Sequence, residues 1–223
     1  MSSHAHTSDP NSPEVYVQYE DIGQQQETYI VGMWSFMVTE IMFFAPLFFV
    51  YFLYRSNYQP DFFAVSAELD WKLGGLNTVI LLLSSFTMAL AVHYSQKGKV
   101  KEQLFSLGAT VACAFGFLIV KYFEYSHKFH KGYIPDGDFH LHYHGAANPE
   151  VARIIYSMYF CMTGIHGIHI VVGILLIGTL MIMTYRKSKH ITDYIPTELI
   201  GLYWHFVDLV WIFLYPLFYL IPR

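Results

Sequence analysis

Charged residues are scarce in this sequence. Of its 223 residues, 13% are Asp, Glu, Lys or Arg, whereas soluble domains carry about 25%. By contrast, 54% of the residues are hydrophobic and 18% are aromatic, and a chain this short cannot bury so much apolar surface in one soluble core. The shortage of charge therefore excludes an ordinary soluble domain and indicates a membrane protein.

Long basic runs and signal-peptide features are lacking as well, and cysteines are few. The net charge is −4 without a long basic run, which argues against nucleic acid as a partner. The two cysteines, Cys113 and Cys161, lie in apolar segments, so we interpret them as small buried side chains rather than a disulfide or zinc site. Residues 1–29 are polar and lack the basic-then-apolar order of a cleavable signal, which predicts a polar tail.

Five long apolar stretches follow this tail. A spanning helix needs roughly 20 mostly apolar residues, whereas the strands of a membrane barrel are shorter and alternate. The stretches that qualify are about 30–54, 75–95, 104–125, 154–185 and 199–221. We therefore predict an all-α polytopic membrane protein, a bundle of five transmembrane helices over residues 30–223.

The loops between these stretches differ in charge. Two short loops on one side hold six basic residues: Lys97, Lys99, Lys101, Arg186, Lys187 and Lys189. The longer loops on the other side hold basic residues diluted by acidic ones. By the positive-inside rule, the N-terminus is predicted to be cytoplasmic and the C-terminus outside.

The long outer loop, residues 126–153, is rich in histidine. It contains His127, His130, His140, His142 and His144. In an extended segment the last three would project to one side and could bind Cu²⁺ or Zn²⁺. Because no cysteine accompanies them and glycine and proline interrupt the loop, a solvated loop is the favoured interpretation.

Placing an ionisable side chain at the centre of a membrane helix costs at least ~2.5 kcal/mol. Each such residue in the apolar stretches therefore needs a stabilising contact or a function that explains it. Glu40 has only apolar and aromatic neighbours and no nearby basic residue. Burial in lipid favours its neutral, protonated form. Two interpretations remain open: a carboxyl that handles protons or reacts, and a neutral acid that hydrogen-bonds a neighbouring helix.

The other membrane ionisable residues occur in pairs spaced by three, which places both side chains on one helix face. Lys121 and Glu124 are predicted to form an ion pair near the membrane interface. His205 and Asp208 are predicted to form a pair that holds a helix contact. His166 and His169 could ligate a haem together with His93 and His205, or could form hydrogen bonds across a close helix contact.

Several of these segments resemble subunit III of the haem-copper oxidases, the cytochrome c oxidase family. Residues 163–169 (Thr-Gly-Ile-His-Gly-Ile-His) and 203–211 (Tyr-Trp-His-Phe-Val-Asp-Leu-Val-Trp) are similar to its longest motifs. Shorter matches are residues 39–44, residues 76–85, the pair Glu124-Tyr125, and Glu198. Together they cover the chain from about residue 30 to its end.

The resemblance implies an accessory subunit of a proton-pumping terminal oxidase that reduces O₂ to water. Haem and copper would lie in the partner subunits I and II, no cofactor would be bound by this chain, and phospholipid would be held. Such a subunit supports the stability of subunit I and its proton uptake. The setting would be the bacterial inner membrane, within a complex that can join a larger respiratory supercomplex.

The resemblance also implies roles for individual residues. Glu40 matches the intramembrane carboxyl that reacts with carbodiimide. Arg186 and Lys189 resemble basic residues that meet lipid headgroups. No residue is implied to be catalytic or to bind a metal. Interhelical polar contacts are expected for the following residues: His93, Glu124, His166, His169, Glu198, His205 and Asp208.

The sequence departs from the seven-helix members of the family, because the polar tail stands where two further helices precede the one bearing the glutamate. A lipid-holding cleft would then need helices of another subunit.

Three other functions are alternatives to subunit III of a cytochrome c oxidase. They are subunit III of a quinol oxidase, a subunit-III-like partner of nitric oxide reductase, and a membrane cytochrome with haem b.

Overall fold

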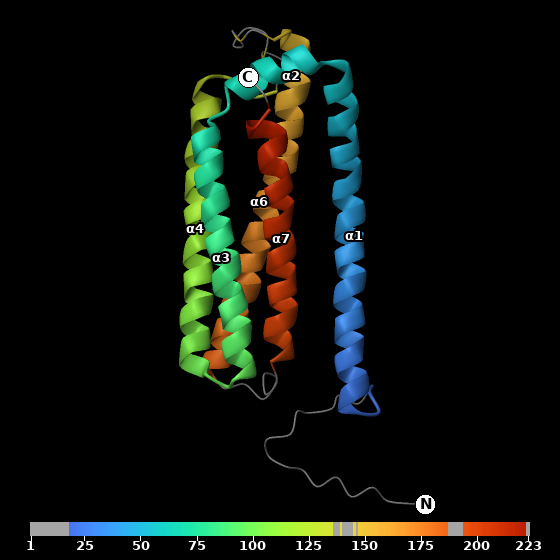
Figure 1. Cartoon of the computed structure of the whole chain (residues 1–223), viewed down its shortest axis with the longest axis vertical. Coiled ribbons are helices and arrows are strands. Elements are labelled where there is room, and N and C mark those ends of the chain that lie inside the picture. The colour runs from blue at the N-terminus through green and yellow to red at the C-terminus, as the bar shows by residue number, and fades with distance from the viewer. Residues whose placement is uncertain (1–17, 136–138, 140–144, 146, 187–193, 222–223) are drawn as a thin grey trace, which may run out of the picture.

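The computed structural model describes residues 18–135, 139, 145, 147–186 and 194–221. Over these residues the chain is helical, and five of the helices are long and apolar enough to cross a membrane. The bounds are α1 Ile22–Asn57, α2 Gln59–Ala67, α3 Trp71–Gln96, α4 Val100–His130, α6 Pro149–Tyr185 and α7 Ile195–Tyr219. The predicted five-helix membrane bundle is confirmed (Figure 1).

The helix ends differ from those predicted. α1 begins at Ile22, inside the predicted tail, where the Asp21 side chain accepts a hydrogen bond from the Gln24 amide at 2.7 Å and caps the helix. α4 continues to His130, past the predicted end near residue 125. The short helix α2, with a proline in its first turn, lies in a segment for which no element was predicted.

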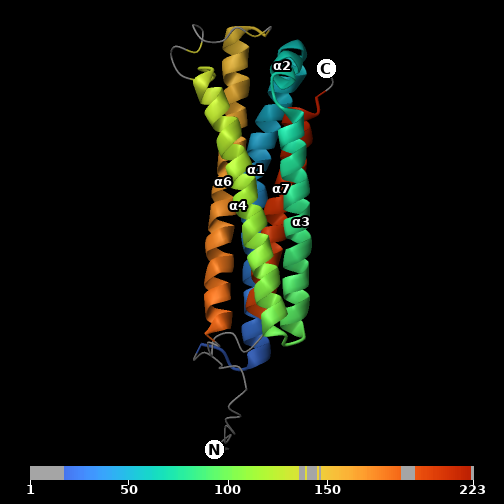
Figure 2. The ribbon, with the colours of Figure 1, turned by 90° about the vertical axis from the view of Figure 1, so that its left-hand side faces the viewer.

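Four of the helices form the core of the bundle. α3 and α4 lie side by side, and α6 and α7 pack against them (Figures 1 and 2). In the most apolar part of α7, 50% of the residues are buried inside the chain, compared with 11% for α1. α7 is therefore the centre of the bundle, whereas α1 leaves most of its apolar side chains for lipid or another protein.

A close contact between α6 and α7 requires a glycine. Trp204 of α7 is fully buried, and its indole N–H donates to the Ser84 hydroxyl of α3 at 2.7 Å. A Cβ on Gly173 of α6 would lie 2.5 Å from the Trp204 ring. The missing side chain of Gly173 thus lets the tryptophan fill the space between three helices.

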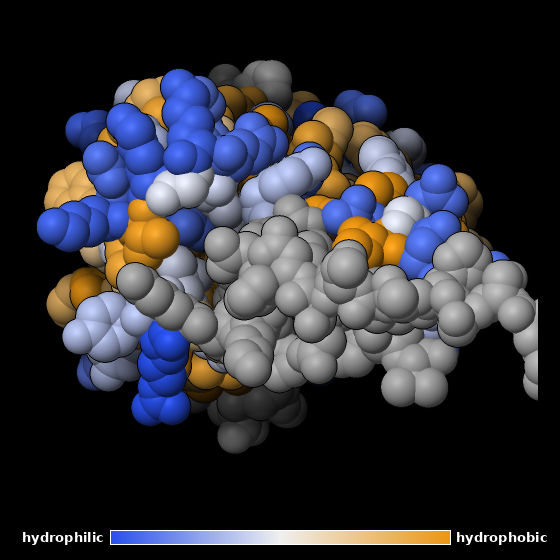
Figure 3. Space-filling model, turned by 90° about the horizontal axis from the view of Figure 1, so that it is seen from below, coloured by the Kyte–Doolittle hydropathy of each residue, from blue (hydrophilic) through white to orange (hydrophobic). Residues whose placement is uncertain are grey.

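The two ends of the bundle carry different groups. The turn from α3 to α4 and the start of α4, with exposed Lys97, Lys99 and Lys101, lie at the end where α1 begins. Hydrophilic residues gather on the α3–α4 side of this end face (Figure 3). The start of α1 and the end of α7 lie at opposite ends of the bundle, as five crossings require.

Candidate functional site

The most chemically distinctive contact joins α1 to α6. The Glu40 carboxyl (Oε2) lies 3.0 Å from His169 Nε2, and the other ring nitrogen, Nδ1, lies 2.9 Å from the carbonyl oxygen of Ile165. A carbonyl oxygen only accepts, so Nδ1 must carry a proton. Nε2 then either accepts the proton of a neutral Glu40 carboxyl or donates to a carboxylate as part of an imidazolium.

The surroundings of this pair favour the neutral form. Both side chains are 17% exposed, and they line an almost wholly apolar cavity of about 450 Å³ with Met33, Phe36 and Tyr203. Separating charge against such surfaces is costly. The distance fits a hydrogen bond between the acid and the imidazole, and the apolar cavity favours the form in which neither group is charged.

Tyr203 holds the histidine from the other side. Its hydroxyl donates to the backbone carbonyl oxygen of His169 at 3.0 Å, and the Phe44 ring lies 5.4 Å from the imidazole. Contacts from α1 and α6 therefore orient the ring, while Tyr203 of α7 binds the backbone of the same residue. The interhelical contact expected for His169 is present, and its partner is Glu40, although nothing in the sequence paired these two residues with each other.

His205 and Asp208 lie on one face of α7 without forming the predicted pair. The Nδ1 atom of His205 lies 2.7 Å from the hydroxyl of Ser85 on α3, so its ring forms a hydrogen bond between α7 and α3. Asp208 is 3% exposed, and neither carboxyl oxygen has a hydrogen-bond partner among the described residues. The interhelical contact of His205 is found, and the prediction of a His205–Asp208 pair is wrong.

His166 corrects a second expectation. Its ring is fully buried, and neither nitrogen has a hydrogen-bond partner in the described part of the chain. Instead the ring stacks on Trp211 at 5.3 Å and meets the edge of Phe117 at 5.5 Å. Its place between aromatic rings, rather than a hydrogen bond across helices, accounts for its burial.

Two further residues do not reach another helix. His93 is exposed on α3 and contacts the ring of its neighbour Tyr94 at 5.7 Å. Glu198 is exposed in the first turn of α7, where an acidic side chain suits the helix dipole. Within the described chain, neither makes the interhelical polar contact that was expected.

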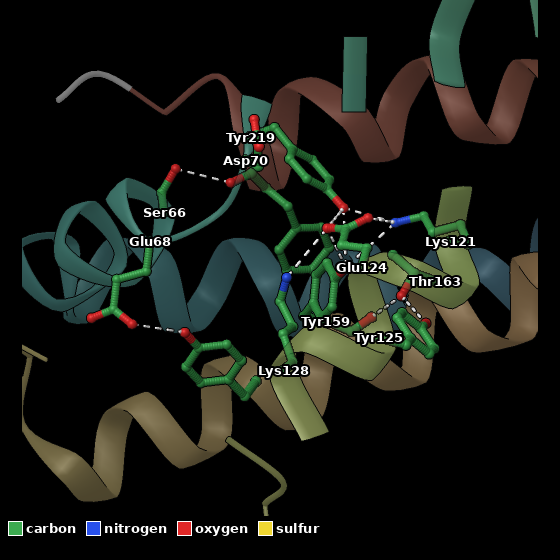
Figure 4. A network of polar contacts seen from close by, with 12 residues as sticks. Ser66, Glu68, Asp70, Lys121, Glu124, Tyr125, Lys128, Tyr159, Thr163 and Tyr219 are labelled. Carbon is green, nitrogen blue, oxygen red and sulfur yellow. Dashed lines mark hydrogen bonds and ion pairs between the residues drawn. The ribbon is translucent and has the colours of Figure 1, made fainter. Parts of the chain in front are cut away.

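A second polar site lies near the end of the bundle where α4 ends (Figure 4). The predicted ion pair is confirmed, with Lys121 Nζ 2.9 Å from Glu124 Oε2. The other oxygen, Oε1, accepts from Lys128 Nζ at 3.3 Å and from the hydroxyls of Tyr159 at 2.8 Å and Tyr219 at 2.5 Å. One carboxylate therefore ties α4 to α6 and α7.

This cluster is larger than the sequence indicated. Lys128 follows Glu124 by one helical turn, so its participation could have been inferred from spacing. Tyr159 and Tyr219 are far away in the sequence, and no local pattern marks them. Lys121 also lies 4.6 Å from the centroid of the Trp211 ring, which adds a cation–π contact to its hydrogen bonds.

The remaining predictions concern lipid and metal. Arg186 is exposed immediately after α6, at the end of the bundle that carries the lysines of the α3–α4 turn. Lys189 and the histidines at 140, 142 and 144 lie outside the described residues. Among the residues that are described, no group of three or more His, Cys, Asp or Glu could hold a metal ion.

Comparison with known proteins gives a consistent result. Residues 17–222 match the family described as cytochrome c oxidase subunit III. The chain is 30% identical to the quinol oxidase subunit 3 of Bacillus subtilis, over 97% of this chain and 96% of that protein. It is 26% identical to the cytochrome c oxidase subunit 3 of the same organism, over 90% of each. The cytochrome c oxidase subunit 3 of Yarrowia lipolytica is 31% identical over 85% of this chain and 66% of that protein, so this chain spans about two thirds of its length.

Proposed function

The chain belongs to the cytochrome c oxidase subunit III family and is a multi-pass membrane component of a haem-copper oxidase complex, and we propose that it is an accessory subunit that binds no haem or copper itself. It supports the stability of subunit I and its proton uptake, while subunits I and II hold the redox centres. The family match over nearly the whole chain carries this proposal.

The environment of the membrane histidines supports the assignment of the cofactors to other subunits. Bis-histidine ligation of haem needs two rings that offer free nitrogens to one iron. Both nitrogens of His169 are engaged within the protein, and Nδ1 of His205 contacts Ser85. His169 therefore offers no nitrogen to an iron, which argues against a haem held by His166 and His169 together.

An optical spectrum tests this point. We expect the oxidase prepared with and without this chain to show the same haem bands per subunit I, and the chain alone to show none. Stoichiometric haem in the isolated chain would overturn the proposal and favour the haem b cytochrome.

The proposed supporting role has its own measurement. The preparation without the chain should turn over more slowly, because its proton uptake is impaired, and should lose activity faster during turnover. Equal lifetimes of the two preparations would contradict a role in stabilising subunit I.

We further propose cytochrome c as the electron donor. A quinol oxidase is the second candidate, because the match to the Bacillus subtilis quinol oxidase subunit spans almost the full length of both chains. The subunit II that co-purifies separates them. Copper ligands and a fused cytochrome c domain would support cytochrome c, and absence of the copper ligands would support quinol.

The proposed location is the bacterial inner membrane, with the N-terminus in the cytoplasm. The lysines of the α3–α4 turn and Arg186 lie at the end where α1 begins, which supports this orientation by the positive-inside rule. A cysteine placed at Lys99 should resist membrane-impermeant thiol reagents in intact cells. Labelling from outside would reverse the orientation.

A further inference from the structure

The cavity beside Glu40 and His169 lies within the membrane-spanning part of the bundle and opens to the hydrocarbon. Its volume of about 450 Å³ is within the range of small-molecule sites. Ile168, Val172 and Leu176 of α6 form part of its wall, and these side chains are 63%, 42% and 38% exposed. Because they face lipid, a ligand must enter from the membrane and must itself dissolve in hydrocarbon.

The polar groups on the cavity wall use their own donors inside the protein. In the uncharged form of the pair, the Nδ1–H group of His169 donates to the carbonyl oxygen of Ile165 at 2.9 Å, and Nε2 accepts the Glu40 carboxyl proton from Oε2 at 3.0 Å. The Tyr203 hydroxyl donates to the carbonyl oxygen of His169 at 3.0 Å. A ligand that carries only acceptors therefore finds no donor on this wall.

One acceptor on the wall remains available. The second carboxyl oxygen of Glu40, Oε1, accepts no hydrogen bond from a described residue, and in the neutral acid this oxygen is a carbonyl acceptor. A ligand hydroxyl can donate to it. Since an unpaired polar group in apolar surroundings is costly, a hydroxyl should bind about tenfold better than an ether or a carbonyl at the same position.

The rest of the wall determines the shape of the ligand. The rings of Phe36 from α1 and Tyr203 from α7 line the cavity side by side, with their centroids 6.0 Å apart and an angle of 39° between their planes. Such rings pack well against another aromatic ring. Met33 and Ile200 add aliphatic surface, which suits a hydrocarbon tail. The wall thus fits an aromatic ring that carries a hydroxyl and an apolar tail.

We propose that this cavity binds an isoprenoid hydroquinone, a quinol, from the membrane. One ring hydroxyl donates to Oε1 of Glu40, the ring packs against Phe36 and Tyr203, and the tail extends into lipid. A phospholipid headgroup does not suit this wall, because its charges would lose their solvation there. The bound quinol stays reduced, since none of the surrounding groups accepts electrons.

The bound quinol has a structural role that goes beyond the proposed function and is independent of the electron donor. Only 11% of the most apolar part of α1 is buried inside the chain, so this helix has few contacts with the rest of the bundle. A ligand between Phe36 of α1 and Tyr203 of α7 adds a contact on each side. Its binding therefore helps to hold α1 against α6 and α7.

The first test measures protection of Glu40 from a hydrophobic carbodiimide in the assembled oxidase, by peptide mass mapping. The oxidase is inhibited with cyanide and kept anaerobic, so that an added quinol stays reduced. The probes are a hydroquinone with a decyl tail, its dimethyl ether and the corresponding quinone. We expect the hydroquinone to protect Glu40 at a concentration about tenfold lower than the other two. Free carbodiimide measured at the end shows that no probe has consumed the reagent.

The second test counts the decyl hydroquinone molecules that the complex retains in native mass spectrometry. We expect Val172→Phe, which fills part of the cavity, to lose one molecule per complex. Val171→Phe is the matched control, because Val171 is the adjacent residue, is similarly exposed at 44% and does not line the cavity. Counting differences between variants leaves a quinol held by another subunit out of the comparison.

Two further variants test the hydrogen bond at Glu40. In Glu40→Gln the amide N–H can donate to His169 and the amide oxygen still accepts, so this variant should retain the hydroquinone. Glu40→Leu removes the acceptor and should lose it. Haem bands and complex mass show that each variant has assembled, and they separate a failure at this cavity from a failure of the accessory role.

Three results would overturn the proposal. Equal protection by the hydroquinone and its dimethyl ether would show that the cavity does not recognise a hydroxyl. An unchanged hydroquinone count in Val172→Phe would place the quinol elsewhere in the complex. A phospholipid that is retained in place of the hydroquinone, and is lost in Val172→Phe, would identify an acyl chain as the occupant.

Discussion

Glu40 and His169 meet 3.0 Å apart, and the ring of His169 is turned so that its other nitrogen donates to the backbone of its own helix. This hydrogen bond and that from the Tyr51 hydroxyl to the carbonyl oxygen of Leu217 tie α1 to the rest of the bundle. The first lies near the middle of α1 and the second near the end of α7. The contact between Glu40 and His169 thus has a structural consequence, because it helps to hold the outermost helix.

Glu40 should react with a hydrophobic carbodiimide in the intact oxidase at neutral pH. The reagent attacks a neutral carboxyl that it reaches through apolar surroundings, which is how Glu40 lies in its cavity. Peptide mass mapping should find the label at Glu40, and Glu40→Gln should abolish it. Glu198→Gln, which changes an exposed carboxyl at the start of α7, should leave labelling unchanged. An unlabelled Glu40 in the native complex would argue against a neutral, accessible acid.

His169→Phe should leave a protonated Glu40 that has lost its acceptor. We expect the infrared C=O stretching band assigned to Glu40, identified by its loss in Glu40→Gln, to move to higher frequency because the hydrogen bond is gone. His166→Phe is the matched control, since His166 makes ring contacts and no hydrogen bond to a described residue. If the band keeps its position in His169→Phe, the two groups do not share a proton.

The sequence was enough to predict the fold but only part of the site. Five apolar stretches sufficed for the five crossings, because a spanning helix must satisfy its backbone internally and must have a minimum length. The Lys121–Glu124 pair followed from spacing on one helix. His205–Asp208 has the same spacing, yet the structure places Ser85 of α3 at the imidazole instead. Spacing shows which side chains share a face and does not show what the opposite helix offers them.

The partners that come from other helices could not be predicted locally. Tyr159 and Tyr219 reach Glu124 from 35 and 95 residues away. His166 and His169 belong to one motif, but one lies among aromatic rings and the other bonds a carboxyl. Their different roles follow from the helices they face. α2 was missed because it is too short and too mixed in polarity for a membrane span.

Glu124→Gln should strongly destabilise the chain. Removing one partner from a buried ion-pair cluster leaves the remaining charges uncompensated, which costs about 3–5 kcal/mol. Here Lys121 and Lys128, both nearly buried, would lose their shared carboxylate. We expect a lower yield of assembled oxidase and a lower apparent Tm. Glu102→Gln, an exposed change in the first turn of the same helix, should lower both far less, because it removes only a favourable interaction with the helix dipole. A Tm for Glu124→Gln equal to that of the control would refute the structural role of the cluster.

His205→Ala should weaken the contact between α3 and α7 without touching a redox centre. The Ser85 hydroxyl would lose its partner, at a cost of about 0.5–1.5 kcal/mol. We expect less assembled complex, and the complex that does assemble should have unchanged haem spectra.

Asp208 on the same face of α7 offers a comparison. Asn is close in shape to Asp, and Asp208 has no hydrogen-bond partner in the described chain, so Asp208→Asn should reduce the amount of assembled complex less than Asp208→Ala does. Selective loss of one haem signal in any of these variants would contradict the accessory role.

Gly173→Ala should impair assembly through a steric effect alone. The new Cβ would lie 2.5 Å from the Trp204 ring, which is itself fully buried and hydrogen-bonded to Ser84, and such overpacking costs about 1–3 kcal/mol. Gly178→Ala on the same helix provides the control, because nothing lies within 4 Å of its added Cβ. Alanine is the better helix former by about 1 kcal/mol, so Gly178→Ala should hold or raise the apparent Tm of the complex. Equal Tm values for the two variants would mean that Trp204 can move aside, and that the contact between α6 and α7 is less tightly packed than the structure describes.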